Sequence, residues 1–446
     1  MMRDKFGNRV VTGAAESVRA IDRFADEFLG YGPGLPDILG AADRDPDSPS
    51  LNHLAASVHL AAESGKGKRH ARTYLRRAEA ASRFSDEREQ HAIRAVRAWL
   101  DGDYPGAARL YERIARRWPQ DVVSAKWGQY HCFNMGDSEG ILRLAEAVLP
   151  VHCGTPYVHG MHAFGLEQCG RLTEAENAAR FAVEVERADP WAHHALAHVM
   201  DTEGRVDEGI AFMRGISGTW EGKGKFIRHH NWWHVGLFHI DRKDPEGALD
   251  IFDRHLWGIF PEFGQEQIGA ISTLWRLELR GVDVGERWAP VAEKVLERGC
   301  EHIQPFLDMH YVYALVRGGH HAAADAFIAS LARHARHAAP AMRRVWGEAA
   351  APVVRGIAAH ARGDYDTAYT LLKPVMTHVH LLGGSHAQRD ILHQTWMDIL
   401  LRSHRYMRAA GTVARGNQPR IYGAGAKRRL QQALRLMRRP SPVPAD

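Results

Sequence analysis

The sequence predicts an all-α solenoid of stacked helical hairpins, and two observations carry this prediction. Gly102-Asp103, Gly136-Asp137, Gly170-Arg171 and Gly204-Arg205 follow one another at intervals of 34 residues. Each glycine ends one helix-periodic apolar stretch and precedes another, which is where a left-handed residue between paired helices is needed. Apolar and polar residues nowhere alternate for long enough to predict a sheet. We therefore expect about eight or nine hairpins in a right-handed superhelix, of the tetratricopeptide type that this period favours.

Length and composition agree with a repeat array. With 446 residues and 45% hydrophobic content, the chain is longer than a single compact core usually becomes. No run approaches eighteen apolar residues, so we expect a soluble cytoplasmic protein without a membrane contact. Four scattered cysteines without a C-x-x-C pair predict neither a disulfide framework nor a cysteine metal site.

The net charge of +5 is unevenly distributed, because no acidic residue occurs from Ile399 to Ala445. A basic tail of this kind can contact RNA or another anionic surface. Only Tyr406 and Tyr422 are interleaved with the basic residues, which is a poor set for base stacking. We therefore interpret the tail as a solvated terminal helix and do not expect a nucleic-acid partner.

Three segments follow from these patterns. Residues 1–50 should hold a capping helix, Ala14 to Leu29, and a linker rich in Gly, Pro and Asp. Residues 51–410 should form the repeat array, with weaker turn signals at Lys243-Asp244, Gly318-Gly319, Gly363-Asp364 and near His404. Residues 411–446 should form a basic C-terminal helix, Gly425 to Arg438, and a tail that covers the open end of the array.

Histidine pairs give the strongest chemical signal. His194, His198 and Asp201 are spaced four and three residues apart, so they form one stripe on a helix, and His230 and His234 repeat the four-residue step. Positions ten, six and three residues before a turn glycine should face the concave side. At Gly204 these are His194, His198 and Asp201, and at Gly170 they are Gly160, Phe164 and Glu167. We expect the two histidine pairs to face one cavity.

Further polar residues are expected around this cavity. Asn231 and Trp233 lie beside the second histidine pair, and the choice of Gly318 or Gly319 as turn residue decides whether Asp308 or His310 faces inward. Ser385 is a natural N-cap with His386, Arg389 and Asp390 just inside its helix, and the free amides of such an end attract carboxylate or phosphate.

The motifs H-A-L-A-H-V, H-N-W-W-H, L-W-R-L-E-L-R-G and G-G-S-H-A-Q-R-D resemble the tetratricopeptide repeat protein 38 family, from about Arg19 to about Tyr406. The resemblance implies a cytoplasmic all-α repeat protein and no particular reaction. The family's recurring residues match at His194, His198, His230, Asn231, Trp232, Trp233, His234, Ser385, His386, Gln388, Arg389 and Asp390. One departure is Gly269, near which the family pattern has an acidic residue.

Three interpretations remain open at this point. Two imidazoles from each of two helices make a tetrahedral shell for zinc, and iron is the other candidate metal. Without a metal, His194 or His198 can serve as general base, oriented by Asp201 or Asp390, while Arg389 holds an anionic substrate. In both interpretations, a cavity lined by His, Trp and Asp binds a small polar or anionic molecule. The third is a scaffold that binds a protein or peptide in its concave groove, without catalysis.

Overall fold

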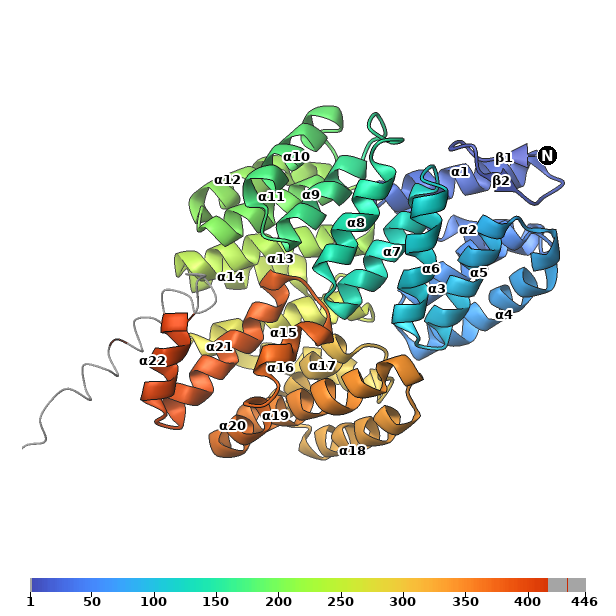
Figure 1. Ribbon diagram of the computed structural model, residues 1–446. Coiled ribbons are helices and arrows are strands. Elements are labelled where there is room, and N and C mark those ends of the chain that lie inside the picture. Colours follow the sequence, from blue (N-terminus) through green and yellow to red (C-terminus); the bar gives the residue numbers. More distant parts are fainter. Residues whose placement is uncertain (1, 416–430, 432–446) are drawn as a thin grey trace, which may run out of the picture.

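The computed structural model describes residues 2–415 and 431, and within them the protein is an all-α solenoid of stacked helical hairpins (Figure 1). The hairpins are α3 (Pro49–Ala61) with α4 (Gly65–Ala81), α5 (Glu87–Leu100) with α6 (Tyr104–Arg117), α7 (Val122–Met135) with α8 (Ser138–Val148), α9 (Val158–Gln168) with α10 (Leu172–Val185), α11 (Pro190–Glu203) with α12 (Val206–Ile216), α13 (Lys225–Arg242) with α14 (Pro245–Ile251), α15 (Gly264–Leu279) with α16 (Trp288–Arg298), α17 (Pro305–Arg317) with α18 (His321–His337), α19 (Ala351–Ala361) with α20 (Tyr365–Leu372), and α21 (His386–Arg402) with α22 (Tyr406–Arg415). The sequence predicted the second half of α15 as a helix but assigned no hairpin turn at Gly281, because this turn lacks the Gly-Asp pattern.

The 34-residue turns have the predicted left-handed geometry. Gly102, Gly136, Gly170 and Gly204 have φ between 69° and 81°. After each of them the next amide donates to a carbonyl five residues back, as in Arg205 N to Met200 O at 2.9 Å. Where aspartate follows the glycine, its carboxylate caps the second helix, as Asp137 does for the amide of Gly140 at 2.8 Å. One dipeptide thus ends one helix and begins the next.

Short helical segments join or extend the hairpins. They are η1 (Ser82–Phe84), η2 (Ser217–Trp220), η3 (Phe252–Leu256), η4 (Gly285–Arg287), η5 (Pro340–Met342), η6 (Val345–Ala350) and η7 (Met376–Leu382). Gly319, with φ of 82°, is the turn residue between α17 and α18, which settles the choice between Gly318 and Gly319.

The N-terminal segment is more ordered than predicted. The capping helix is present as α1 (Ala15–Leu29), but the expected linker contains α2 (Asp37–Arg44), which buries Ile38, Ala41 and Ala42. A small antiparallel pair, β1 (Met2–Arg3) and β2 (Arg9–Val10), precedes α1. Strands of two residues are too short to give a readable alternation. The predicted helix from Gly425 to Arg438 lies outside the described residues.

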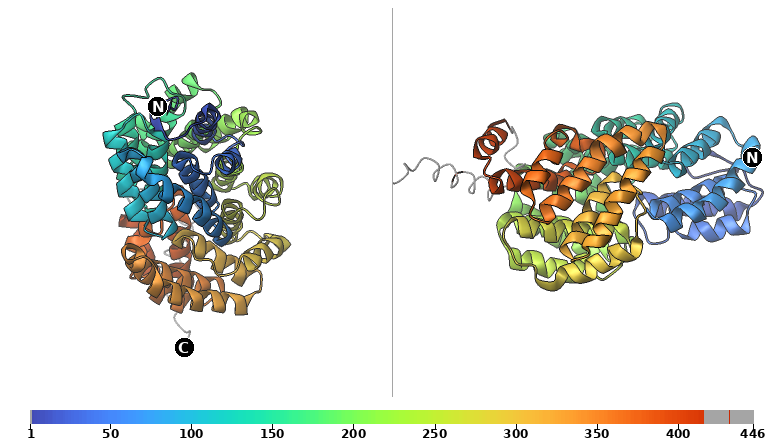
Figure 2. Two further views of the ribbon diagram at one scale, coloured as in Figure 1. Left: turned by 90° about the vertical axis from the view of Figure 1, so that its right-hand side faces the viewer. Right: turned by 90° about the horizontal axis from the view of Figure 1, so that it is seen from below.

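The solenoid bends until its early and late repeats touch (Figures 1 and 2). Glu63, which follows α3 and is 4% exposed, is the centre of one contact between them. Its carboxylate accepts hydrogen bonds from Tyr130 on α7 at 2.8 Å, from Gln265 on α15 at 2.6 Å and from Gln304 at 2.9 Å. Three repeats distant in sequence are therefore joined through one buried side chain.

A second contact joins α7 to η7 and the start of α21. The amide of Gly384 donates to the Phe133 carbonyl at 3.2 Å, and a Cβ on Gly136 would lie 2.1 Å from the His380 carbonyl oxygen. Only glycine at position 136 permits this approach of the two backbones. The first hairpins and the last ones are thus packed together rather than held apart at the two ends of an open coil.

Replacing Gly136 with alanine tests this closure. A left-handed alanine costs about 1–2 kcal/mol by itself, and at Gly102, where nothing lies within 4 Å of the added Cβ, Gly102→Ala should lose only that amount. Gly136→Ala should lower the free energy of unfolding by at least about 1 kcal/mol more, because overpacking costs typically 1–3 kcal/mol. Urea unfolding of the two variants measures the difference, and equal losses would mean that the contact with His380 is not tight.

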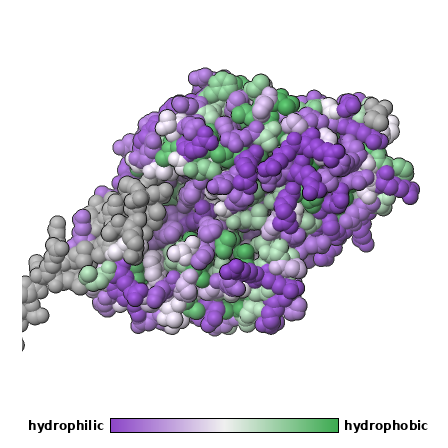
Figure 3. Space-filling model, viewed as in Figure 1, coloured by the Kyte–Doolittle hydropathy of each residue, from purple (hydrophilic) through white to green (hydrophobic). Residues whose placement is uncertain are grey.

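Hydrophilic side chains cover most of the face shown in Figure 3, with hydrophobic residues in small patches between them. Within the described part of the chain, no helix is long and apolar enough to span a bilayer. The apolar residues instead form one large core that runs through the hairpins.

Candidate metal centre

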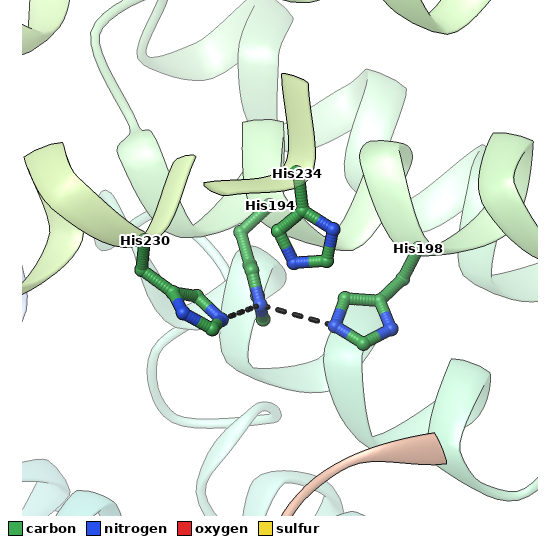
Figure 4. Close-up of side chains that lie close together, drawn as sticks. All are labelled: His194, His198, His230 and His234. Atoms are coloured by element: carbon green, nitrogen blue, oxygen red, sulfur yellow. Dashed lines mark hydrogen bonds between the residues drawn. The ribbon is translucent and has the colours of Figure 1, made fainter. Parts of the chain in front are cut away.

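Two neighbouring helices, α11 and α13, bring the histidine pairs together. Asp189 caps α11 by accepting from the amides of Trp191 and Ala192 at 2.9 and 3.1 Å, and Gly204 ends the helix. Lys243, with φ of 67°, ends α13 in the same left-handed way. A four-residue step is close to one helical turn, so each pair projects from a single face. Figure 4 shows the two faces opposed, with all four imidazoles gathered between the helices.

The four rings meet through their nitrogen atoms. His194, His198, His230 and His234 are all buried, and one nitrogen from each lies within 4.8 Å of the other three. Nε2 of His194 lies 3.1 Å from Nε2 of His198 and 3.0 Å from Nε2 of His230. Four nitrogens around a zinc ion, at about 2.0–2.1 Å each, would be about 3.3 Å apart in a tetrahedron. The closest spacings therefore resemble those of a metal site, and binding would draw the widest pair together.

Hydrogen bonds within the cluster do not satisfy both nitrogens of His194. A ring nitrogen carries either one proton or one in-plane lone pair, so Nε2 of His194 can either donate to one neighbour or accept from one. It cannot pair fully with His198 and His230 at once, and Nδ1 of His194 has no hydrogen-bond partner among the described residues. A cation placed among the Nε2 atoms would accept all of their lone pairs.

Two histidines of the cluster, His194 and His230, are held in their uncharged form. Burial lowers the pKa of His194 and of His230 well below the usual range, and the neighbouring imidazoles lower the pKa of each ring further. Neutral imidazole is the form that binds a metal ion, so no proton has to leave these two rings at neutral pH.

One carboxylate supports the cluster from α9. Oε2 of Glu167 lies 3.4 Å from Nδ1 of His198, and both side chains are 1% exposed. Burial alone would raise the pKa of Glu167, but His198 and the Gln168 side chain hold that pKa below its usual value. A carboxylate that binds the outer nitrogen of a histidine fixes the ring's orientation and tautomer.

Aromatic rings enclose the histidines on the remaining sides. Trp191 stacks on His194 with ring centroids 4.2 Å apart, and Phe226 and Trp233 both stack on His230, at 5.4 and 5.2 Å. Phe164 contacts His194 and His198 at 5.1 and 5.6 Å. These walls keep bulk water from the nitrogens and limit how far each ring can rotate.

A small cavity of about 10 Å³ is lined in part by His230 and Trp233. It is lined by polar groups of Gln265, Ser272, His310 and Gln388, together with apolar residues. A space of this volume holds about one water molecule. Gly269 also borders it, and a Cβ there would lie 2.2 Å from Cε1 of His229. The His229 ring thus fills the place beside Gly269, near which the resembled family has its acidic residue.

Several residues predicted for the site lie near it without joining the four rings. Asn231 is fully buried and donates to the Pro190 carbonyl at 3.1 Å, and Trp233 packs on His230. His386 is exposed, and its Nε2 lies 2.7 Å from the Gln168 carbonyl, next to Glu167. The Arg389 guanidinium bonds the Gly384 carbonyl and lies near Glu167. The repeats that contain residues 194, 230 and 386 therefore lie close together, and this proximity is the condition for any site that they share.

Other predicted residues serve different contacts. Asp201 and Asp390 both interact electrostatically with Arg276, a fully buried arginine on α15. The role of Asp201 or Asp390 in orienting a histidine stays a prediction, whereas Glu167 lies directly against His198. Asp308 forms a hydrogen bond with His302. Nδ1 of His310 lies 2.8 Å from the Phe306 carbonyl, and the His310 side chain lines the small cavity. Sequence reasoning placed Glu167 on the inner face but did not include it in the site.

The fold and its turns define a tetratricopeptide-type helical-repeat protein, here with four buried histidines between two adjacent repeats. No family model matches the chain. Solved structures that match the chain include a human IFIT1 dimer with m7Gppp-AAAA, at 14% identity, a TM-score of 0.45 and coverage of 98% of both chains. A monomeric IFIT1 mutant with Gppp-AAAA has 14% identity, a TM-score of 0.44 and the same coverage. The finer resemblance to the tetratricopeptide repeat protein 38 family stays a prediction.

Proposed function

We propose that this protein binds one divalent transition-metal ion, with zinc as the first choice, between α11 and α13. The observation that carries the proposal is the convergence of four buried imidazole nitrogens within 4.8 Å of one another. Imidazole suits zinc, copper, nickel and iron, and four nitrogen ligands in a tetrahedron suit zinc in particular. The Glu167 carboxylate behind His198 supplies the outer contact that metal-bound histidines usually have.

Four protein ligands fill a tetrahedral shell, so the ion would join two repeats rather than activate a substrate. It would link residues 194 and 198 of α11 to residues 230 and 234 of α13. A ligand bound only by the folded state adds stability in proportion to the logarithm of its concentration above Kd. Occupancy would therefore set the stability of this part of the solenoid, and metal supply would regulate it.

Binding of a small polar molecule is a secondary part of this proposal. The cavity beside His230 has room for about one water molecule, so a larger molecule would need side chains to move. The competing interpretation, a scaffold for an extended peptide, needs inner-face residues that a partner can reach. His198, Trp233 and Arg389 are instead 1%, 2% and 7% exposed, which favours the metal.

Elemental analysis of the purified protein tests the proposal. We expect about one equivalent of zinc per chain after purification without chelator, and the same stoichiometry when the stripped protein is titrated with zinc. If iron were found in place of zinc, the four histidines would remain the proposed ligands and only the identity of the metal would change. A stripped protein that is folded by circular dichroism and takes up no zinc, iron, copper or nickel at micromolar concentration would falsify the proposal.

Glu167→Gln separates the carboxylate's role from that of the rings. Glutamine keeps the size of the side chain but removes the charge that holds Nδ1 of His198, so zinc affinity should fall about 10–100-fold. Competition with a chromogenic chelator measures the change in Kd. Glu174→Gln is the matched control, since Glu174 lies on the next helix, α10, and pairs with Arg171 at the surface. An unchanged affinity in Glu167→Gln would remove the carboxylate from the site.

A further inference from the structure

A second group of chemically reactive residues lies away from the histidine cluster, where α17 and α18 meet the loop that precedes them. It consists of Ser330 on α18, His302 in the loop between α16 and α17, and Asp308 on α17. Among the described residues, the side-chain hydrogen bonds and ring contacts of His302 and Asp308 involve each other, Ser330, Phe327, His334 and Trp346, and no histidine of the cluster.

The three side chains form a hydrogen-bonded chain. Oδ2 of Asp308 lies 2.6 Å from Nδ1 of His302, and Nε2 of His302 lies 2.5 Å from Oγ of Ser330. An ionised carboxylate can only accept, so it fixes the tautomer of His302 with the proton on Nδ1 and the lone pair on Nε2. That lone pair faces the serine hydroxyl. A serine beside a histidine that is oriented by an aspartate is the arrangement of an activated nucleophile.

The aspartate and the histidine of this group are more deeply buried than the serine. The side chains of Asp308 and His302 are 1% and 4% exposed, whereas Ser330 is partly exposed on its helix. The Phe327 and Trp346 rings contact the His302 ring at 4.8 and 6.4 Å between centroids, which shields it from water. The base and its orienting group are thus enclosed, and the nucleophile can be reached.

The loop holds His302 in an uncommon backbone conformation. His302 has φ of 47°, and left-handed residues other than glycine cost energy and recur at functional positions. The next residue is fixed from another repeat, because Tyr104 Oη donates to the Ile303 carbonyl at 3.0 Å. The ring position of His302 is therefore set by the contact between early and late repeats as well as by Asp308.

We propose that Ser330 is a nucleophile that takes an acyl group from an ester, with His302 as general base and Asp308 as its positioning residue. The Ser330 oxygen forms a bond to the acyl carbon while its proton moves to Nε2 of His302. The bond to the leaving alkoxide then breaks, and that alkoxide takes the proton from His302. Water, deprotonated by His302, later hydrolyses the acyl-serine, which restores the hydroxyl and releases a carboxylic acid.

One group beside the serine can stabilise the negative charge of the tetrahedral intermediate. The His334 ring lies one helical turn after Ser330, with its centroid 5.3 Å from that of His302. Burial, followed by the positive charges of His302 and Lys68, lowers the pKa of His334 to about 4, so its neutral ring would act through an N–H donor. The Ser330 hydroxyl also has the Phe327 carbonyl as an acceptor at 3.0 Å, so reaction requires it to turn to His302.

Labelling of the full chain with an alkyl fluorophosphonate tests the nucleophile. The reagent forms an Oγ–phosphorus bond and releases fluoride and the proton, and tandem mass spectrometry locates the adduct. We expect a single adduct at Ser330, none in Ser330→Ala, and wild-type labelling in Ser217→Ala. Ser217 is the matched control because it also bonds a carbonyl three residues back, in its case Arg214 at 2.9 Å.

His302→Asn tests the base without disturbing the backbone, since asparagine tolerates left-handed φ. Labelling of this variant should slow at least about 100-fold, the usual contribution of a general base. Asp308→Asn should slow it at least tenfold and shift its pH dependence, which a purely structural role would not do. A folded wild-type chain without an adduct at Ser330, or equal rates in His302→Asn, would overturn the proposal. The proposal would also be overturned if the reagent labelled Ser330 but p-nitrophenyl acetate gave no burst of p-nitrophenol, because no acyl-serine would then form.

Discussion

Replacing His194 with alanine should abolish stoichiometric zinc binding and the stability that zinc adds. In the proposed site His194 would be the central ligand, because its Nε2 lies within 3.1 Å of the Nε2 atoms of both His198 and His230. In the wild type, zinc at 100 times its Kd should raise the free energy of unfolding by about 2.7 kcal/mol. The variant should show no increase. Chemical denaturation with and without zinc measures both values.

His193→Ala is the control for this experiment, because its ring is as deeply buried as that of His194 on the same helix. His193 binds the Arg187 carbonyl at 2.9 Å and the Trp220 indole at 3.1 Å, away from the cluster. This variant should lose stability but keep the increment due to zinc. If zinc stabilises His194→Ala as much as the wild type, the metal is bound elsewhere.

Replacing Asp121 with alanine should destabilise the protein by about 3–5 kcal/mol, because it leaves a buried guanidinium without its partner. Nη1 of Arg88 lies 2.6 Å from Oδ2 of Asp121, and the two side chains are 10% and 5% exposed. Asp121 also caps α7 through the amide of Ser124 at 3.0 Å. Thermal and urea unfolding measure the loss.

Asp325→Ala separates burial from pairing as the cause. Asp325 also lies 2.6 Å from an arginine, Arg362, but its side chain is 64% exposed. A surface pair contributes at most about 1 kcal/mol, so this variant should unfold near the wild-type midpoint. Similar losses in the two variants would show that the environment of Asp121 is not the source of its effect.

Local sequence patterns were sufficient to predict most of the hairpins, although not α15–α16, and the spacing of the histidines on their helices. The glycine period gave the turns at Gly102, Gly136, Gly170 and Gly204, since each needs a left-handed residue with an i to i−5 hydrogen bond. The four-residue steps on α11 and α13 gave the four ligand candidates. Both are properties of single helices or of adjacent ones, which spacing along the chain determines directly.

Contacts between distant repeats could not be predicted in the same way. The bend of a solenoid accumulates small rotations from each hairpin, and these depend on side-chain packing rather than on period. Glu63, whose partners lie more than 60 residues away, gave no signal in its own surroundings. For the same reason, the interaction of Asp201 and Asp390 with Arg276 of α15 could not be predicted from the spacing on their own helices.

The hydrogen bonds of Glu63 also affect how the molecule unfolds. An open repeat array frays from its ends, because each unit contacts only its neighbours and opens at its own cost. Here the first hairpin is bonded to residues of α15 and of the segment before α17, so it cannot detach without breaking the middle of the chain. Unfolding should therefore be a concerted event. A variant that lacks the first hairpin would also lose the hydrogen bonds of Glu63 to Gln265 and Gln304, and so be destabilised in the middle of the chain.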